Sequence, residues 1–255
     1  MVHPKKHLGQ HFLTDPAIAE RIVDLLPEEQ DMTVMEIGPG TGILTSFLVN
    51  KPFEKFIPVE IDHESFVFLH NKYPQIRDSL LHADFLKMAD QLFPGASFHI
   101  IGNFPYNISS QIFFRILDHR DNVKSVVCML QKEVADRIAA PPGSKTYGIL
   151  SVLLQAFYSP KYRFSVKPGS FFPPPRVHSA VITLERNNTE QLNCDEKLFF
   201  RVVKTTFNQR RKTIRNSLKT ILLTLGDENE LLSKRPEQLG VGEFIELTNF
   251  VASRM

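Results

Sequence analysis

Cysteine is scarce in this sequence, with only Cys128 and Cys194 among 255 residues. Two cysteines are too few for a disulfide framework or a zinc cluster. Both are therefore interpreted as free thiols in a reducing cytosol. The nine histidines show no spacing typical of metal ligands, so the sequence predicts no metal site.

Long apolar runs are also missing. No run approaches the length of a membrane span, and the N-terminal residues MVHPKKHLGQHFLTD lack the apolar region of a secretory signal. Apolar residues make up 42% and charged residues 23% of the chain, which is typical of a globular protein. We expect a cytoplasmic protein with no membrane association and no obligate protein partner.

Short apolar segments alternate with helical ones over the first half of the chain. This alternation predicts a parallel sheet covered on both faces, with ligands beyond the carboxyl ends of its strands. The expected strands cover residues 33–37, 55–61, 79–83, 97–101 and 123–130, and the expected helices 42–50, 64–72, 107–118 and 131–139.

The sequence pattern in the second half of the chain indicates a domain boundary. A buried helix is expected over 147–158, and a strand over 176–185 after the prolines at 173–175. Residues 187–195 are polar, and only helical patterns follow them. The sequence thus predicts a Rossmann-like α/β domain over 1–186 and a small α-helical domain over 187–255.

The segment EIGPGTG (36–42) follows the first strand and opens a helix. Glycines there allow a sharp turn and close approach of the backbone to a ligand. A dinucleotide fingerprint would have glycine at position 43, which is Ile43, and no Lys-Ser/Thr pair follows as in a phosphate-binding loop. The loop is either an ordinary strand–helix turn or a site for a ligand without phosphates.

Two acids stand at the ends of the next two strands. Glu60 can accept both hydroxyls of a ribose, and Asp84 can accept from the amino group of an adenine. Either acid alone is more often a solvated carboxylate. Together with the glycine loop they indicate an adenosine without phosphates, for which S-adenosylmethionine is the obvious candidate.

Asn103-Phe104-Pro105-Tyr106 follows the fourth strand. It resembles the Asn-x-Pro-Tyr motif of methyltransferases that act on exocyclic amino groups of bases. The Asn103 side-chain oxygen and the Phe104 carbonyl can accept the two amino hydrogens of an adenine and aim its lone pair. Pro105 stiffens the turn, and the Tyr106 ring offers a face for a base swung out of its RNA context.

Six segments together resemble the ribosomal RNA adenine dimethyltransferase family, in the branch that dimethylates two adjacent adenines near the 3′ end of small-subunit (16S) rRNA. The resemblance covers about residues 4 to 220. It is carried by PKKHLGQHFLTD (4–15), EIGPGTG, GNFPYNISS (102–110), LQKEVADR (130–137), SFFPPPRVHSA (170–180) and TFNQRRKTIRNSL (206–218).

The resemblance implies the class I S-adenosylmethionine-dependent methyltransferase fold and a set of site residues. The implied cofactor contacts are His11, Leu13, Gly38, Glu60, Asp84 and Asn103. Family members often have Asn where this chain has His11. The resemblance also implies that Phe171 packs against the target base on the side opposite Tyr106.

Residues 197–219 contain eight Lys/Arg and no Asp/Glu. The cations recur three or four residues apart, and the apolar residues follow the opposite stripe, so an amphipathic helical pair with one cationic face is predicted. Because unbalanced cations repel one another, RNA phosphate is the expected partner. The residues predicted to contact 16S rRNA are Arg210, Arg211, Lys212 and Arg215.

Three other functions stay open at this point. One is a single-adenine methyltransferase of large-subunit rRNA, against which the segment FNQRRKTIRNSL counts. Another is a DNA adenine methyltransferase, for which a C-terminal part of this size is small. The third is a non-enzymatic RNA-binding assembly factor, against which the intact Glu60, Asp84, Asn103 and Tyr106 count.

Overall fold

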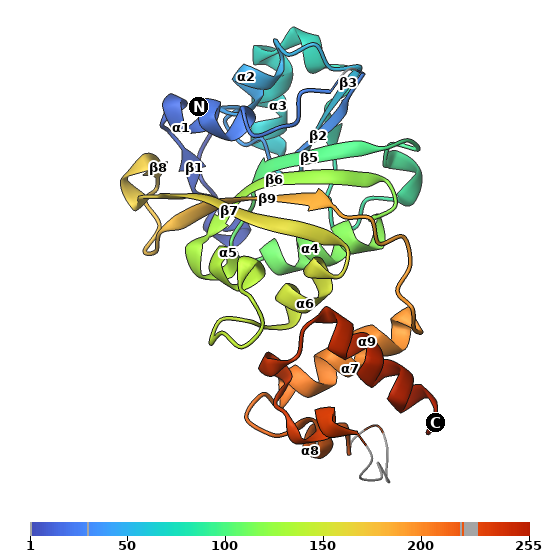
Figure 1. Cartoon of the computed structure of the whole chain (residues 1–255). Coiled ribbons are helices and arrows are strands. Elements are labelled where there is room, and N and C mark those ends of the chain that lie inside the picture. Colours follow the sequence, from blue (N-terminus) through green and yellow to red (C-terminus); the bar gives the residue numbers. More distant parts are fainter. Residues whose placement is uncertain (1, 30, 220, 222–228) are drawn as a thin grey trace. The chain divides into compact units, whose positions relative to one another are not determined.

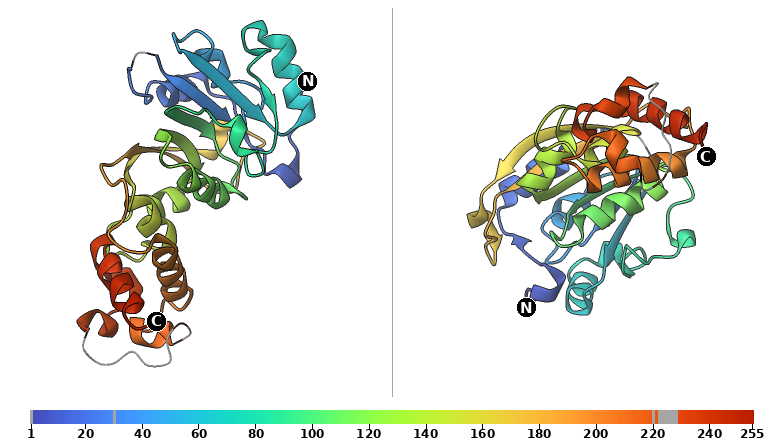
Figure 2. Two further views of the ribbon diagram at one scale, coloured as in Figure 1. Left: turned by 90° about the vertical axis from the view of Figure 1, so that its right-hand side faces the viewer. Right: turned by 90° about the horizontal axis from the view of Figure 1, so that it is seen from below.

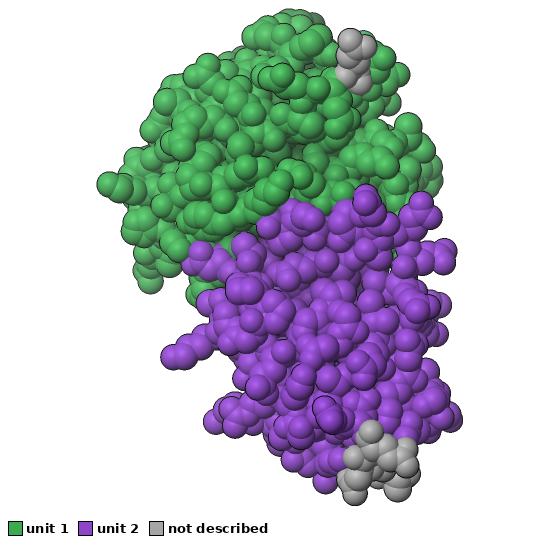
Figure 3. Space-filling view, viewed as in Figure 1, with its two compact units in different colours: residues 1–135, 161–186 green, residues 136–160, 187–255 purple. Residues whose placement is uncertain are grey.

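The computed structural model describes residues 2–29, 31–219, 221 and 229–255 (Figure 1). The chain forms two compact units, one of residues 1–135 and 161–186 and the other of residues 136–160 and 187–255 (Figure 3). One division between the units falls after residue 186. Residues 136–160, assigned from the sequence to the first domain, group with the C-terminal segment instead.

The first unit is built on a seven-stranded sheet with the order β4-β3-β2-β5-β6-β9-β7. The neighbouring strands from β4 to β6 pair in parallel, as predicted, whereas β9 runs antiparallel to β6. The sheet is therefore mixed. Its strands are β2 (Thr33–Ile37), β3 (Lys55–Glu60), β4 (Leu81–His82), β5 (Phe98–Asn103), β6 (Val123–Gln131), β7 (Tyr158–Val166) and β9 (Ser179–Arg186).

Strand β7 was not predicted. The helix expected over 147–158 ends at Gln155, and Tyr158 already begins the strand. The strand lies at the edge of the sheet, and most of its side chains are partly or fully exposed. It also contains Pro160. A polar edge strand with a proline lacks the apolar pattern that identifies a buried strand.

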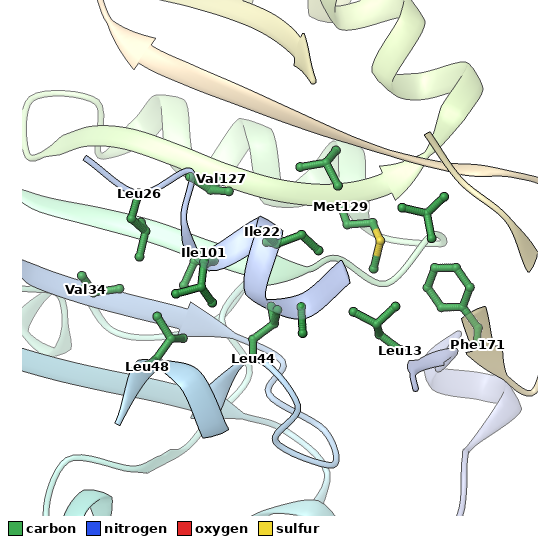
Figure 4. Close-up of a cluster of buried hydrophobic side chains, with 14 of the residues drawn as sticks. Leu13, Ile22, Leu26, Val34, Leu44, Leu48, Ile101, Val127, Met129 and Phe171 are labelled. Carbon is green, nitrogen blue, oxygen red and sulfur yellow. The ribbon is translucent and has the colours of Figure 1, made fainter. Parts of the chain in front are cut away.

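Helices cover both faces of this sheet. Helices α1 (Pro16–Val23) and α2 (Thr45–Leu48) lie on one face, and α4 (Ser109–Asp118) lies on the other (Figure 1). Beneath α1 and α2, Ile22, Leu44 and Leu48 pack against Val34 of β2 and Ile101 of β5 in one buried cluster (Figure 4). The remaining helices of the region are α3 (His63–Lys72) and α5 (Lys132–Ala139).

A second, two-stranded sheet joins the N-terminal segment to a distant part of the chain. Strand β1 (Phe12–Leu13) pairs antiparallel with β8 (Phe171–Phe172), so that Phe12 faces Phe172 and Leu13 faces Phe171. The Thr14 N–H also donates to the Ser170 carbonyl at 2.8 Å. These bonds hold the N-terminal segment against residues 170–173.

In the second unit, the described residues after 187 are helical wherever they have regular structure, as predicted. Helices α7 and α9 lie side by side (Figures 1 and 2), and the rings of Phe207 and Phe244 stack between them at 5.9 Å. Helix α6 joins the unit because it packs against both. The bounds are α6 (Ile149–Gln155), α7 (Glu196–Asn208), α8 (Ile214–Leu218) and α9 (Val241–Ala252). Among the described residues, no helix combines the length and apolarity needed to cross a membrane.

Glu36 places a carboxyl group inside the first unit. Its side chain is 1% exposed on β2, and its Oε2 accepts a hydrogen bond from the Thr45 hydroxyl at 2.7 Å. Burial raises the pKa of Glu36 to about 8, although the Thr45 hydrogen bond opposes the shift. A buried carboxyl resists ionisation because it has lost its hydration.

This shift predicts a pH dependence of stability. Between the ordinary value of 4.5 and about 8, the folded chain keeps a proton that the unfolded chain has released. The contribution of Glu36 to the free energy of unfolding therefore falls as pH rises through this range. Glu36→Gln keeps an oxygen for Thr45 but cannot ionise. We expect its melting temperature, relative to the parent chain, to rise between about pH 5 and about pH 9.

The measurement is thermal unfolding of both proteins across this pH range. Glu54→Gln, at an exposed position, is the matched control and should show no such trend. A difference between Glu36→Gln and the parent that is independent of pH would contradict the assignment of the proton to Glu36.

Candidate active site

A cavity of about 240 Å³ opens at the carboxyl ends of the strands, where the topology predicted a ligand site. It lies entirely within the first unit. Five segments line it: residues 7–12, the glycine loop, the end of β3 with Ile61, residues 83–86, and residues 103–108 with Ile112.

The glycine loop presents bare backbone to this cavity. Gly38 has φ 67°, a left-handed conformation that disfavours any side chain, and a Cβ built there would meet nothing within 4 Å. Gly40 has φ 58°, and a Cβ there would meet the Phe12 ring at 2.8 Å. The loop therefore leaves room for a ligand beside Gly38, while Phe12 packs tightly on Gly40.

The two predicted acids line the same cavity. Glu60 is 2% exposed, and its two oxygens accept from the Gly40 N–H at 2.9 Å and the Asp62 N–H at 2.8 Å. Burial raises the pKa of the Glu60 carboxyl, and those two N–H groups oppose the shift. Asp84 accepts from the Leu86 N–H at 3.0 Å and stays partly exposed. Because a carboxylate has about four lone-pair positions, both acids keep capacity for a ligand.

The amide of Asn103 has a defined orientation. Its Nδ2 donates to the main-chain carbonyl of His11 at 2.9 Å. Among the residues that the structure describes, nothing donates to Asn103 Oδ1 or to the Phe104 carbonyl. The Phe104 N–H is fixed by the Met129 carbonyl at 2.9 Å, and its ring is buried against Phe113. Two acceptors at adjacent positions thus remain available at the edge of the cavity.

Tyr106 is held on one ring face and at its hydroxyl. The His11 ring stacks on it with centroids 5.3 Å apart, and the His11 Nδ1 lies 2.7 Å from the Pro173 carbonyl. The Tyr106 hydroxyl forms a short hydrogen bond with Ser179. Burial raises the pKa of the Tyr106 hydroxyl, and this hydrogen bond opposes the shift. The His11 ring thus covers one face of the Tyr106 ring.

Two predicted site residues lie in the core instead of the cavity. Leu13 is 3% and Phe171 is 4% exposed, and both belong to the hydrophobic cluster beneath α1 (Figure 4). The two residues pair across the β1–β8 sheet, and neither is among the residues that line the cavity. The reason is the alternation of side chains along a strand. It turns Phe171 inward and leaves Phe172 62% exposed.

Other residues of the cavity wall were not predicted. Ile61, Phe85, Leu86 and Asn107 each follow a predicted residue closely in sequence and line the same space. Lys5 holds the N-terminal segment there through a short ion pair with Asp62, and the His3 N–H donates to Glu64 at 3.2 Å. These contacts span about sixty positions, and no local pattern indicates them. Within the described residues, no group of three metal-ligating side chains is found.

The basic residues predicted to contact RNA lie in the second unit. Arg211 and Lys212 are exposed and take part in no ion pair within the described part of the chain. Arg210 differs, because its Nε lies 3.8 Å from Glu237 and its guanidinium donates to the Ser144 carbonyl at 3.3 Å. Glu237 thus provides a counter-charge that is absent from the segment itself. Arg215, on α8, is partly exposed.

Known proteins are similar to this chain in sequence and in fold. A family model described as ribosomal RNA adenine dimethylase matches residues 1–243. A Bacteroides fragilis protein named ribosomal RNA small subunit methyltransferase A is 55% identical over 258 residues, which cover 98% of this chain and 93% of the relative. A Flavobacterium johnsoniae protein of the same name is 53% identical over 251 residues, covering 97% and 95%.

Two solved structures show the same fold. A dimethyladenosine transferase from Plasmodium falciparum superposes with a TM-score of 0.80 at 24% identity, covering 96% of this chain and 98% of that one. The 23S rRNA methyltransferase ErmE superposes with a TM-score of 0.68 at 24% identity, covering 94% and 99%. The predicted class I methyltransferase fold is confirmed. The chain belongs to the ribosomal RNA adenine dimethylase family and is a methyltransferase.

Proposed function

We propose that this enzyme transfers methyl groups from S-adenosylmethionine to the N6 atoms of two adjacent adenines near the 3′ end of 16S rRNA. The RNA is presented in the small ribosomal subunit or its precursor, which implies a cytoplasmic location. The orientation of Asn103 supports this proposal most strongly, because it leaves two acceptors for one exocyclic amino group. The names of the relatives at more than 50% identity support the choice of small-subunit RNA.

The cofactor proposal rests on the fit between the cavity and an adenosine. Gly38 leaves space for a ligand against its backbone, and Glu60 and Asp84 provide acceptors for ribose hydroxyls and for an adenine amino group. His11, which lines the cavity beside them, is a further candidate contact. When bound, S-adenosylmethionine supplies an electrophilic methyl group on a sulfonium sulfur.

We infer that the enzyme catalyses methyl transfer by positioning the adenine amino group. An adenine amino nitrogen is a weak nucleophile because its lone pair is delocalised into the ring. Asn103 Oδ1 and the Phe104 carbonyl accept its two hydrogens and aim the lone pair, and the face of Tyr106 opposite His11 stacks the base. Preorganised acceptors lower the barrier without a general base. Because each adenine receives two methyl groups, the same acceptors must readmit a monomethylated base.

RNA affinity is assigned to the second unit. Arg211 and Lys212, and Arg215 beside them, present positive charge to phosphates, which contribute affinity and not base identity. Arg210 has a second role besides contacting phosphate. It pairs with Glu237, whose carbonyl accepts from the Gly143 N–H at 2.6 Å, so it also helps to position the 143–144 loop.

The Glu60 carboxylate should contribute to cofactor binding. Glu60→Gln removes one charged acceptor, so S-adenosylmethionine should bind about 1–3 kcal/mol more weakly. Isothermal titration calorimetry measures the loss, with Glu54→Gln, at an exposed position before β3, as the control. Binding of a nicotinamide dinucleotide as tightly as S-adenosylmethionine by the parent chain would refute the cofactor assignment.

Methylation of the proposed substrate can be mapped directly. With labelled cofactor and unmethylated small ribosomal subunits, the parent enzyme should label two adjacent adenines near the 3′ end of 16S rRNA and leave large subunits unlabelled. Asn103→Ala should lower turnover about a hundredfold or more, measured with cofactor and RNA both saturating. Labelling of large-subunit RNA alone, or near-normal turnover of Asn103→Ala, would contradict the proposal.

The basic residues should affect RNA binding and not chemistry. Replacing Arg211 and Lys212 by Gln should flatten the slope of log affinity against log salt by about 1.4, at roughly 0.7 for each contact with irregular RNA. Cofactor affinity should stay unchanged, and methylation should recover at saturating RNA. The exposed Lys55→Gln variant is the control. An unchanged slope in the double variant would show that these residues are only a solvated surface.

A further inference from the structure

The first unit has several exposed large apolar side chains within one short stretch of chain. Seven large apolar side chains are exposed among the described residues, and three of them lie between positions 162 and 177. They are Tyr162 at 38%, Phe172 at 62% and Val177 at 44% exposure. Exposed apolar patches rimmed by polar residues mark interaction sites.

The same stretch is positively charged. The chain has no Asp or Glu between Asp136 and Glu185. Lys167 and Arg176 are exposed there and form no ion pair within the described residues, whereas Lys161 and Arg163 lie 3.0 and 3.7 Å from Glu185. The Lys132 ammonium adds to this charge, since it lies 5.4 Å from the centre of the Tyr162 ring.

Hydrogen bonds tie this stretch to the wall of the active-site cavity. The Pro173 carbonyl, next to Phe172, lies 2.7 Å from His11 Nδ1. On the other side, Ser179 holds the Tyr106 hydroxyl, and the His178 carbonyl accepts from the Lys132 N–H at 2.9 Å. Phe172 also pairs with Phe12, which itself lines the cavity. Figure 1 shows β8 beside the adjoining ends of β7 and β9.

We propose that Tyr162, Phe172, Arg176 and Val177, with Lys132, form a single-stranded RNA surface that stacks the nucleotides flanking the target adenine. We call it the flanking surface. It rests on the proposed function and adds to it a second RNA contact, in the first unit and separate from Arg211 and Lys212.

Chemical complementarity favours RNA as the occupant. Proteins that bind single strands combine cations along the backbone with aromatic rings on which bases stack. The flanking surface has both. Because consecutive nucleotides are covalently linked, a base in the cavity brings its neighbours toward the stretch that contacts His11 and Tyr106 through Pro173 and Ser179. An exposed Phe172 gives such a neighbour a ring to stack on.

The test measures binding of a fluorescent single-stranded RNA of about 12 nucleotides with two central adenines, a length within known single-strand site sizes. Phe172→Ala should weaken binding at least about fivefold, the low end of the range for losing one stacked base. Phe172→Tyr retains a ring and should bind like the parent. Leu92→Ala removes an exposed apolar side chain outside the flanking surface, 46% exposed, and should change nothing.

The cationic part is tested by salt dependence. Arg176→Gln should flatten the salt slope by about 0.7, the contribution of one phosphate contact, and Lys55→Gln should not. Calorimetry with S-adenosylmethionine and thermal unfolding confirm that the variants keep the fold and the cofactor site.

The outcomes separate this inference from the proposed function. If Phe172→Ala binds the RNA like the parent while the parent methylates small-subunit rRNA, the flanking surface is wrong and the function stands. If the parent does not methylate that RNA but Phe172→Ala still weakens binding, the proposed function is wrong and the flanking surface stands. A defect seen with whole subunits and not with the protein-free RNA would assign the surface to a ribosomal protein and overturn the inference.

Discussion

One hydrogen bond connects the parts of this active site, from Asn103 Nδ2 to the main-chain carbonyl of His11 at 2.9 Å. An asparagine amide has two ends with opposite hydrogen-bonding character. A fixed carbonyl on the nitrogen side turns the oxygen side away from His11 and leaves it available as an acceptor. The N-terminal segment therefore decides which end of Asn103 a base would meet, although it lies 92 positions away in sequence.

The placement of that carbonyl depends on how the N-terminal segment is held. Lys5 pairs with Asp62 just beyond β3, Phe12 packs on Gly40, and Leu13 pairs with Phe171. These contacts connect the segment to the end of β3 near Glu60, to the glycine loop and to the chain before β9. The core burial of Leu13 and Phe171 thus has a structural role, because it anchors the strand β1 that directly follows His11.

The sequence predicts those residues of the site that lie at the end of a strand or directly after it. The glycine loop, Glu60, Asp84 and Asn103 each follow an apolar run directly, and parallel strands bring such ends together. Contacts between distant segments leave no local signal. The packing of residues 136–160 with the C-terminal helices and the Arg210–Glu237 pair could not be predicted for that reason. Strand β7 was missed because an exposed edge strand has no apolar pattern.

The central claim is that Asn103 works through an oriented amide and not merely through an oxygen at the right place. Asn103→Asp tests it, because aspartate keeps the shape and the acceptor but cannot donate to the His11 carbonyl. Single-turnover methyl transfer with cofactor and RNA saturating is the measurement. We predict that the methyl-transfer rate of Asn103→Asp is as low as that of Asn103→Ala, because the Asp carboxylate is repelled by the His11 carbonyl. A rate equal to that of the parent enzyme would contradict the account.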